Sequence, residues 1–316
     1  MQKPIKTIDV VTSARNEQGN ITSLFQGIEA SLAGENVSFR LIVTDNRSAD
    51  GTWDEILSLS KAHPDKVLGL KMSRDFGFEG AIRAGLSRAK ADAIVVMASD
   101  LQDDPARIPQ LIFELNNGVD HVFQVVEDRP DESWLRRKQA SAFYALAEKL
   151  SDGLIVRNSS TFRAFKLPVL NAIQSLPEKA RFLRALSMYV GFNTKGLSFP
   201  RAARSKGVSK ASVFHVVGLG VRGIIANSTK PLDFIGLLGV GLSIFSLLST
   251  IVLALVWVTF GVPFAGFGTL VGLILLAFSS LFFTMGIIAQ YLSLMYEEIK
   301  ARPDYIISES TGEMPG

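Results

Sequence analysis

The stretch Ile94-Val95-Val96-Met97-Ala98-Ser99-Asp100-Leu101-Gln102-Asp103-Asp104-Pro105 carries the most informative pattern in this sequence of 316 residues. An apolar run typical of a buried strand stops in a cluster of carboxylates and an amide, and Pro105 prevents the strand from continuing. At the carboxyl end of a parallel strand, such oxygen ligands suit a hard divalent cation that carries phosphates. The alternative is an acidic loop in which Asp103 or Asp104 caps a helix, and the segment alone leaves both open.

The residues on either side of this stretch alternate between strand and helix patterns. Strand-like runs are expected at residues 8–12, 39–44, 67–72 and 93–97, and helical periodicity at residues 21–32, 79–89 and 108–115. This order predicts an α/β fold with a parallel sheet that is covered on both faces. Right-handed crossovers then bring the polar loops that follow the strands to one edge of the sheet.

Two further loops at this predicted edge carry candidate binding residues. Asp45 and Asn46 follow the second strand and could accept hydrogen bonds from a base or a ribose, although a turn rich in Asp and Asn has the same composition. Arg74 follows the third strand and could contact a phosphate, or could lie in an ordinary surface loop. Asp100 and Gln102 are two residues apart, so in an extended segment both side chains could reach one ion.

A long charge-free segment follows in the last third of the chain. Residues 234–296 contain no Asp, Glu, Lys, Arg or His, which is enough for two membrane-spanning helices joined at Gly261-Val262-Pro263-Phe264-Ala265-Gly266. Lys230 precedes this segment, Lys300 and Arg302 follow it, and the predicted connection has no basic residue, so both ends are expected on the cytoplasmic side. The alternative is a buried helical hairpin in a soluble protein. The tail at residues 309–316 is expected to fray.

Composition excludes several other classes of protein. The chain has no cysteine, which rules out disulfides, thiolate metal sites and a cysteine nucleophile. A net charge of +3 without a dense basic tract gives no support to nucleic-acid binding. The N-terminus leads straight into a strand pattern without the apolar core of a signal peptide.

Basic side chains gather between the α/β pattern and the charge-free segment. Scattered Lys and Arg usually form a solvated face, but at this position they could also meet the phosphate of a lipid, which Arg is suited to hold in a bidentate manner. The residues concerned are Arg129, Arg136, Arg137, Arg204 and Lys210.

An ordered set of motifs resembles the family-2 GT-A glycosyltransferases that act on polyprenyl phosphates. These relatives include dolichyl-phosphate mannose synthase, bactoprenol glucosyltransferases and the undecaprenyl-phosphate aminoarabinose transferase. The motifs are Ala14-Arg15-Asn16-Glu17, Asp45-Asn46-x-Ser48-x-Asp50-Gly51-Thr52, Ser73-Arg74-x-Phe76-Gly77, Asp100-Leu101-Gln102-Asp103-x-Pro105, Phe162-Arg163 and Arg204-x-x-Gly207-x-Ser209-Lys210.

The resemblance implies an architecture for the whole chain. It consists of a GT-A nucleotide-diphospho-sugar transferase domain with a mostly parallel, Rossmann-like sheet, interfacial helices and a C-terminal hairpin of two transmembrane helices. The expected boundaries are a cytoplasmic catalytic domain at 1–210, an interfacial helix at 211–230, membrane helices at about 233–260 and 267–293 within 231–300, and a cytoplasmic tail at 301–316.

The resemblance also implies an activity and a partner set. The expected reaction is inverting transfer of one sugar from a nucleotide-sugar, most often a UDP-sugar, to undecaprenyl phosphate at the cytoplasmic leaflet of the inner membrane, for modification of a cell-envelope glycan. A homotetramer is the family expectation.

Site residues follow from the same resemblance. It implies that the donor nucleotide is bound by Asn16, Glu17, Asp45, Asn46, Arg74 and Asp100. It implies that Asp100 and Gln102 bind Mg²⁺ or Mn²⁺, and that Asp100 and Arg163 are catalytic. The residues implied to bind the donor and lipid phosphates are Arg129, Arg137, Arg163, Arg204, Ser209 and Lys210.

Two departures from the family pattern touch the chemistry. Ala98 stands where the family usually has the first Asp of Asp-x-Asp-Leu-Gln, and Thr161 stands where an acidic residue often precedes Phe-Arg. A catalytically degenerate relative that acts as a binding or assembly partner is therefore the alternative function. A processive polysaccharide synthase is disfavoured, because the chain has no Gln-x-x-Arg-Trp motif and its two predicted membrane helices are too few to form a polymer channel.

Overall fold

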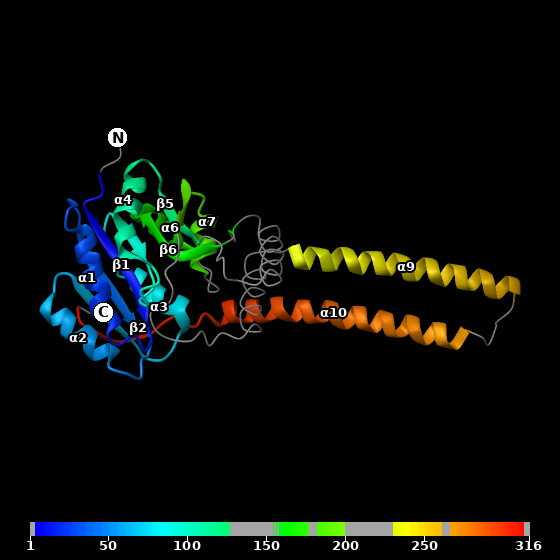
Figure 1. Cartoon of the computed structure of the whole chain (residues 1–316). Coiled ribbons are helices and arrows are strands. Elements are labelled where there is room, and N and C mark those ends of the chain that lie inside the picture. The colour runs from blue at the N-terminus through cyan, green and yellow to red at the C-terminus, as the bar shows by residue number, and fades with distance from the viewer. Residues whose placement is uncertain are drawn as a thin grey trace, which may run out of the picture.

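The fold consists of an α/β domain from which two long helices project (Figure 1). The computed structural model of the chain describes residues 4–126, 154, 156, 158–176, 182–199, 230–260 and 266–312. The strands are β1 (Thr7–Ala14), β2 (Ser38–Asp45), β3 (Val67–Met72), β4 (Ala93–Val96), β5 (His121–Val126), β6 (Ser159–Lys166), β7 (Thr194–Phe199) and β8 (Ile307–Ser310). The helices are α1 (Asn20–Leu32), α2 (Thr52–Ala62), α3 (Gly77–Leu86), the 3-10 helix η1 (Pro105–Arg107), α4 (Ile108–Asn116), α6 (Leu167–Ser175), α7 (Leu183–Tyr189), α9 (Lys230–Phe260) and α10 (Phe267–Lys300).

The described strands form one sheet of eight strands in the order β7-β5-β6-β4-β1-β2-β3-β8. The centre of the sheet, β4-β1-β2-β3, is parallel throughout, as the alternating sequence pattern predicts. Later strands make the sheet mixed, because β6 runs antiparallel to β4 and β5, and β8 runs antiparallel to β3. The predicted α/β fold with a mostly parallel sheet is therefore confirmed.

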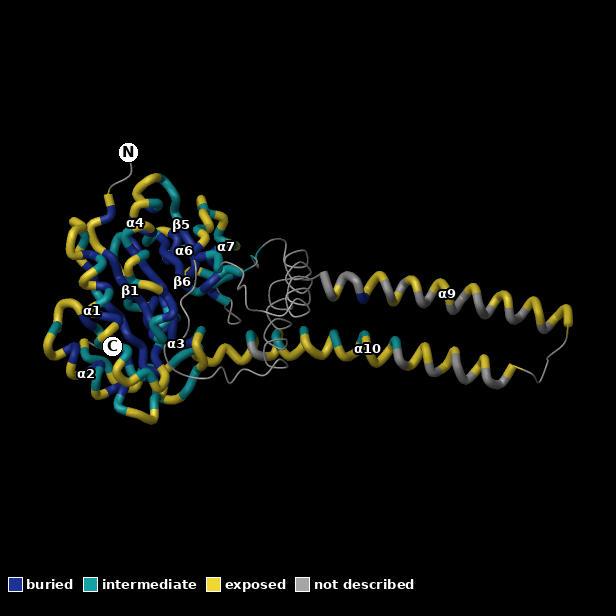
Figure 2. The backbone as a smooth tube through the Cα atoms, viewed as in Figure 1, coloured by how far each residue is buried: buried dark blue, intermediate teal, exposed yellow. Residues whose placement is uncertain are grey.

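Both faces of the sheet are buried, and neighbouring residues of a strand serve opposite faces. Val10 of β1 packs with α1 and α4, whereas Val11 packs with α3 and α6. Double coverage explains why the central strands are apolar runs rather than alternating patterns (Figure 2).

Helix α3 packs closely on the sheet at Gly85. A Cβ atom at this position would lie 2.5 Å from Val11 Cγ1 and 3.3 Å from Thr44 Oγ1. We expect Gly85→Ala to lower the free energy of unfolding by about 1–3 kcal/mol through overpacking. Thermal unfolding in detergent measures the change. Gly34→Ala is the control, because no heavy atom lies within 4 Å of its added Cβ, and an equal loss in both variants would contradict the packing argument.

Helices α9 and α10 leave the α/β domain side by side (Figure 1). The helices expected at about 233–260 and 267–293 extend in the structure over Lys230–Phe260 and Phe267–Lys300. Among the described residues, one helical segment is long and apolar enough to cross a membrane, judged by length and composition alone. It is Leu276–Lys300, which has 25 residues and a mean hydropathy of 1.4, and none of its most apolar stretch is buried inside the structure. The expected interfacial helix at 211–230 lies outside the described residues, apart from Lys230.

The expectation of a frayed tail at 309–316 is wrong for its first part. After α10 the chain returns to the α/β domain and forms β8, which pairs with the edge strand β3. Glu309 forms an ion pair with Lys71, with 2.9 Å between Glu309 Oε1 and Lys71 Nζ. Local sequence gives little sign of this strand, because its order comes from backbone hydrogen bonds to a strand more than 230 residues away.

Candidate functional site

The carboxyl ends of β1, β2, β3 and β4 meet at one edge of the sheet. Ala14 at the end of β1 lies opposite Asp45 at the end of β2, and Asn46 N donates to Ala14 O at 2.9 Å. Met97, just after β4, donates its N–H to Val11 O at 3.2 Å. The three predicted polar loops are therefore neighbours, in the place where open α/β sheets bind ligands.

Asp45 is a completely buried carboxylate with one oxygen lacking a partner. Its Oδ1 accepts a hydrogen bond from Ser48 N at 3.2 Å, whereas Oδ2 has no hydrogen-bond partner among the described residues. Leaving a buried carboxylate oxygen unpaired costs free energy. A ligand N–H or O–H that enters at this strand end would satisfy the oxygen, so Asp45 fits recognition of a base or a ribose.

Asn46 and Asp75 connect the second and third polar loops. Asn46 Nδ2 donates to Asp75 Oδ1 at 2.7 Å, and Asn46 Oδ1 accepts from Phe76 N at 3.0 Å. Asp75 Oδ2 forms an ion pair with Arg15 Nη1 at 2.5 Å. Asp75 is thus the centre of a network that sequence reasoning missed, although it lies inside the quoted motif next to Arg74.

Asn16 has a local structural role in this network. Its backbone is left-handed with φ 56°, its N–H donates to Ser48 Oγ, and its Oδ1 accepts from Ala49 N at 2.8 Å. The neighbouring Glu17 accepts from Asn20 Nδ2 at 2.6 Å through Oε2. In the structure Asn16 supports the loop after β2, whereas the Glu17 side chain bonds to Asn20 of α1. Contact with a nucleoside stays a prediction for both residues.

The carboxylates of the acidic segment after β4 accept hydrogen bonds from different backbone N–H groups. Asp104 Oδ1 accepts from Ala106 N and caps η1, and the buried Asp103 accepts from Ala98 N at 2.9 Å through Oδ2. Asp100 is partly exposed and accepts from Gln102 N at 3.2 Å through Oδ1. The capping alternative is therefore correct for Asp104, while Asp100 is a partly exposed carboxylate at the edge.

A metal at this edge would depend on ligands beyond the protein. Among the described residues, no group of three or more His, Cys, Asp or Glu side chains is arranged to hold a metal ion. Mg²⁺ is commonly held by one or two carboxylates together with substrate phosphates. The segment is not extended as predicted, because Leu101 between the two residues is left-handed with φ 59° and the chain bends there. Asp100 and the amide oxygen of Gln102 still supply the donor types of such a shared site.

Arg163 lies inside the domain on β6, beside Val96 at the end of β4. Its Nη1 donates to Ser187 Oγ at 2.5 Å and its Nη2 to Ser160 O at 2.7 Å. Burial, with Arg184 nearby, lowers the pKa of Arg163 to about 9, and Glu79 opposes the shift. Burial in turn raises the pKa of Glu79. These contacts give Arg163 a role in joining β6 to α7, and phosphate binding by Arg163 stays a prediction.

The remaining predicted residues lie at the periphery or outside the described part. Arg74 is exposed, with its guanidinium carbon 4.1 Å from the centre of the Phe76 ring and its Nη1 donating to Asp75 O at 3.2 Å. The predicted phosphate-binding residues outside the described residues are Arg129, Arg137, Arg204, Ser209 and Lys210.

Comparison with known families decides the class of this site. Residues 9–173, which include most of β1, all of β2 to β6 and every polar loop described above, match the model of glycosyl transferase family 2. The chain belongs to glycosyl transferase family 2. This family-2 chain is therefore a glycosyltransferase, as the ordered motifs predict.

Several relatives of this family-2 glycosyltransferase match along nearly their whole length. The uncharacterized glycosyltransferase sll0501 of Synechocystis sp. is 30% identical over 305 residues, which is 96% of each chain. The SfII prophage-derived bactoprenol glucosyl transferase of Shigella flexneri is 31% identical, covering 96% of this chain and 98% of the relative. The undecaprenyl-phosphate 4-deoxy-4-formamido-L-arabinose transferase of Pseudomonas savastanoi is 26% identical, covering 97% and 91%.

A solved structure with partial similarity is glucosyl-3-phosphoglycerate synthase from Mycobacterium tuberculosis, crystallised with Mn²⁺, UDP and glucosyl-3-phosphoglycerate. It has a TM-score of 0.47 and 18% identity, and the match covers 70% of this chain and 78% of the other.

Proposed function

We propose that this glycosyltransferase transfers a single sugar from a nucleotide-sugar to a polyprenyl phosphate at the membrane surface. The observation that carries the proposal is the pair of carboxylates at one sheet edge, the buried Asp45 with an unpaired oxygen and the accessible Asp100. A nucleoside and a metal-bound diphosphate are the two halves of a nucleotide-sugar that these groups suit. Two near full-length relatives are named for bactoprenol and undecaprenyl-phosphate substrates.

The donor half of the proposed reaction depends on the loop network. Asp45 would bind the base or ribose, and Asn46 is held in place for the same task by Asp75. Asp100 and Gln102 would hold Mg²⁺ or Mn²⁺, which neutralises the charge of the leaving diphosphate when bound. UDP is the nucleotide that the family resemblance favours.

The acceptor half needs little help from a base. A phosphate monoester has a second pKa near 6, so the acceptor is largely a dianion at neutral pH. Its oxygen forms a bond to the anomeric carbon as the bond from that carbon to the diphosphate oxygen breaks, with inversion at carbon. Positioning of the two reactants then supplies most of the rate, which makes Thr161 compatible with activity.

The two long helices support a membrane location for this reaction. Helix α9 has 31 residues and α10 has 34, which correspond to about 46 and 51 Å at about 1.5 Å per residue and exceed the ~30 Å hydrocarbon core. The described apolar side chains of both helices are largely exposed (Figure 2). We infer a two-helix hairpin in the inner membrane, with the α/β domain and both chain ends in the cytoplasm, where Lys230 and Lys300 flank the hairpin.

A transfer assay tests the proposed function. The full chain in proteoliposomes is incubated with labelled nucleotide-sugars, undecaprenyl phosphate and Mn²⁺ or Mg²⁺, with EDTA in a parallel reaction. The expected product is a lipid-linked monosaccharide that EDTA suppresses. Failure to form a lipid-linked product from any common donor overturns the proposal.

A substitution at Ala98 distinguishes the hypothesis of an active enzyme from that of a catalytically degenerate one. Ala98 is partly exposed two residues before Asp100, so a carboxylate there adds negative charge beside the proposed metal. We expect Ala98→Asp to tighten the apparent Mn²⁺ affinity about tenfold, since ligand charge tunes cation affinity, with kcat changing little. Metal titration of the transfer reaction measures the effect, and Ala98→Asn is the uncharged control. A large gain in kcat would instead indicate that the wild-type chain is degenerate.

A further inference from the structure

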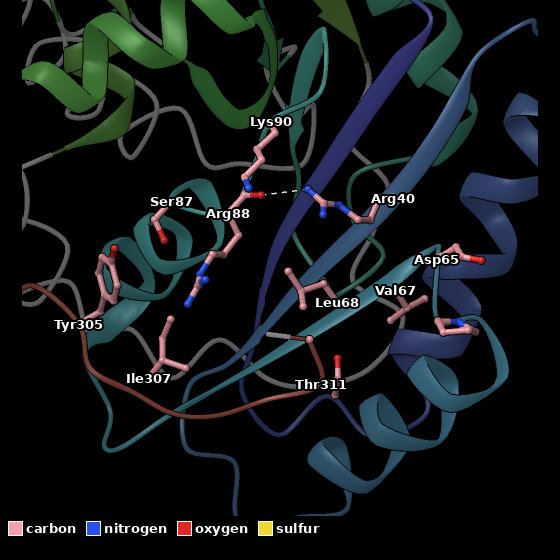
Figure 3. Close-up of a pocket in the computed structure, with 12 residues that line it drawn as sticks. Arg40, Asp65, Val67, Leu68, Ser87, Arg88, Lys90, Tyr305, Ile307 and Thr311 are labelled. Carbon is pink, nitrogen blue, oxygen red and sulfur yellow. Dashed lines mark hydrogen bonds between the residues drawn. The ribbon is translucent and has the colours of Figure 1, made fainter. Parts of the chain in front are cut away.

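The segment that follows α10 returns to the α/β domain, contacts α3 and then pairs with the edge strand β3. We name residues 301–312 the C-terminal strap. Figure 3 shows Tyr305, Ile307 and Thr311 of the strap across a cavity of about 820 Å³ from Arg88. At the far end of the strap, Thr311 N donates to Gly69 O at 3.0 Å, and Gly69 N donates to Thr311 Oγ1 at 2.9 Å.

The first residues of the strap contact the chain before and after the loop Ser73-Arg74-Asp75-Phe76-Gly77, which we name the 73–77 loop. Before the loop, Ser73 N donates to Ile306 O at 2.9 Å, which extends the pairing of β3 with β8. After the loop, Asp304 forms an ion pair with Arg83 of α3. The strap therefore contacts the chain on both sides of the loop, at Ser73 before it and at Arg83 after it.

The Arg83–Asp304 ion pair can fix the position of α3 relative to the strap. The two side chains are only 16% and 17% exposed, so the pair is screened much less than a surface pair. The backbone of the strap is also packed tightly here, because a Cβ on Gly80 would lie 2.9 Å from Asp304 O. By contrast, the Lys71–Glu309 pair farther along the strap has Glu309 55% exposed, and such pairs contribute little.

The 73–77 loop in turn holds the groups that face the donor site. Asp75 accepts from Asn46 Nδ2 and pairs with Arg15, and Phe76 N donates to Asn46 Oδ1. A shift of the loop would displace Asn46, which lies next to Asp45 and its unpaired oxygen. The strap is continuous with α10, so the same contacts connect this loop to the long helices.

We propose that Asp304 and Arg83 are positioning residues for donor binding, which set the 73–77 loop, and through it Asn46, relative to α10. This inference rests on the proposed nucleotide-sugar site. It assigns a role in substrate affinity to residues that do not themselves reach the donor.

Transfer kinetics with the full-length chain test the role. We expect Asp304→Asn to raise KM for the nucleotide-sugar about tenfold, because it removes the carboxylate charge that pairs with the largely buried Arg83, with kcat within about twofold. The charge-reversed pair, Arg83→Asp with Asp304→Arg, is expected to recover most of the affinity that each single variant loses. Glu309→Gln is the matched control on the same strap and should leave KM unchanged.

Hydrogen exchange provides a readout that does not depend on the donor. Amides of the 73–77 loop should exchange faster in Asp304→Asn than in the wild type or Glu309→Gln, with unchanged protection in β1 and β4. Unchanged loop exchange and unchanged KM in Asp304→Asn would overturn the inference, as would a loss of kcat alone. If faster exchange is seen in a protein that binds no nucleotide-sugar at all, the proposed function fails while the mechanical link between strap and loop stands.

Discussion

Replacing Asp100 with Asn is expected to lower kcat/KM for sugar transfer about a thousandfold, since it removes the accessible carboxylate that would help bind the metal and the leaving diphosphate. Asn keeps the size of the side chain and can still accept the hydrogen bond from Gln102 N, now 3.2 Å from Asp100 Oδ1. The loss should therefore come from charge rather than from misfolding. Transfer rates measured over a range of Mn²⁺ concentrations, together with thermal unfolding, provide the test.

Asp104→Asn is the control for this prediction. Asp104 lies in the same acidic segment, is exposed and caps η1 through Ala106 N, and Asn is an equally good cap. Its activity should stay close to that of the wild type. Similar losses in both variants would show that overall acidity of the loop matters rather than a specific ligand, and full activity of Asp100→Asn would remove this residue from the metal site.

Replacing Asp45 with Asn should change affinity and stability in opposite directions. Loss of a hydrogen bond to a charged acceptor is expected to raise KM for the nucleotide-sugar about 10- to 100-fold. The same change removes a buried charge whose Oδ2 has no hydrogen-bond partner among the described residues, so the melting temperature without donor should be equal or higher. Donor titration and thermal unfolding of the same preparations measure the two effects.

The control for Asp45 is Asp54→Asn, a change of the same chemistry on the exposed side of α2. It should alter neither donor KM nor melting temperature beyond small surface effects. A fall in the melting temperature of Asp45→Asn without any change in KM would make Asp45 a structural carboxylate and would remove the observation on which the donor site is built.

The parallel centre of the fold was predictable because its signal is local. Val95 and Val96 lie in an uninterrupted apolar run, and both faces of their strand are covered. The positions of Asp45 and Asp100 followed from the rule that parallel strands end at one edge. The division of labour in the acidic segment was open, since composition does not show which of Asp100, Asp103 and Asp104 meets a backbone N–H.

Features that depend on distant partners were not predictable. Strand β8 is ordered by β3, and Arg163 is buried because Ser187 of α7 and Ser160 receive its guanidinium. Asn16 belongs to a recognised motif, yet its contacts are with Ser48 and Ala49 of the next loop. Asp75 becomes important only when the second and third loops are neighbours in space. In each case tertiary contacts, rather than propensity, decide the role.

The position of β8 in the chain has a consequence for how the protein is made. Ribosomes deliver this strand after both long helices, so the N–H and C=O groups along the edge of β3 stay open until α9 and α10 have been synthesised. An open edge of this kind invites pairing with other chains. Completion of the sheet is thus coupled to completion of the two long helices, and a chain that ends before residue 301 would leave the edge of β3 unpaired.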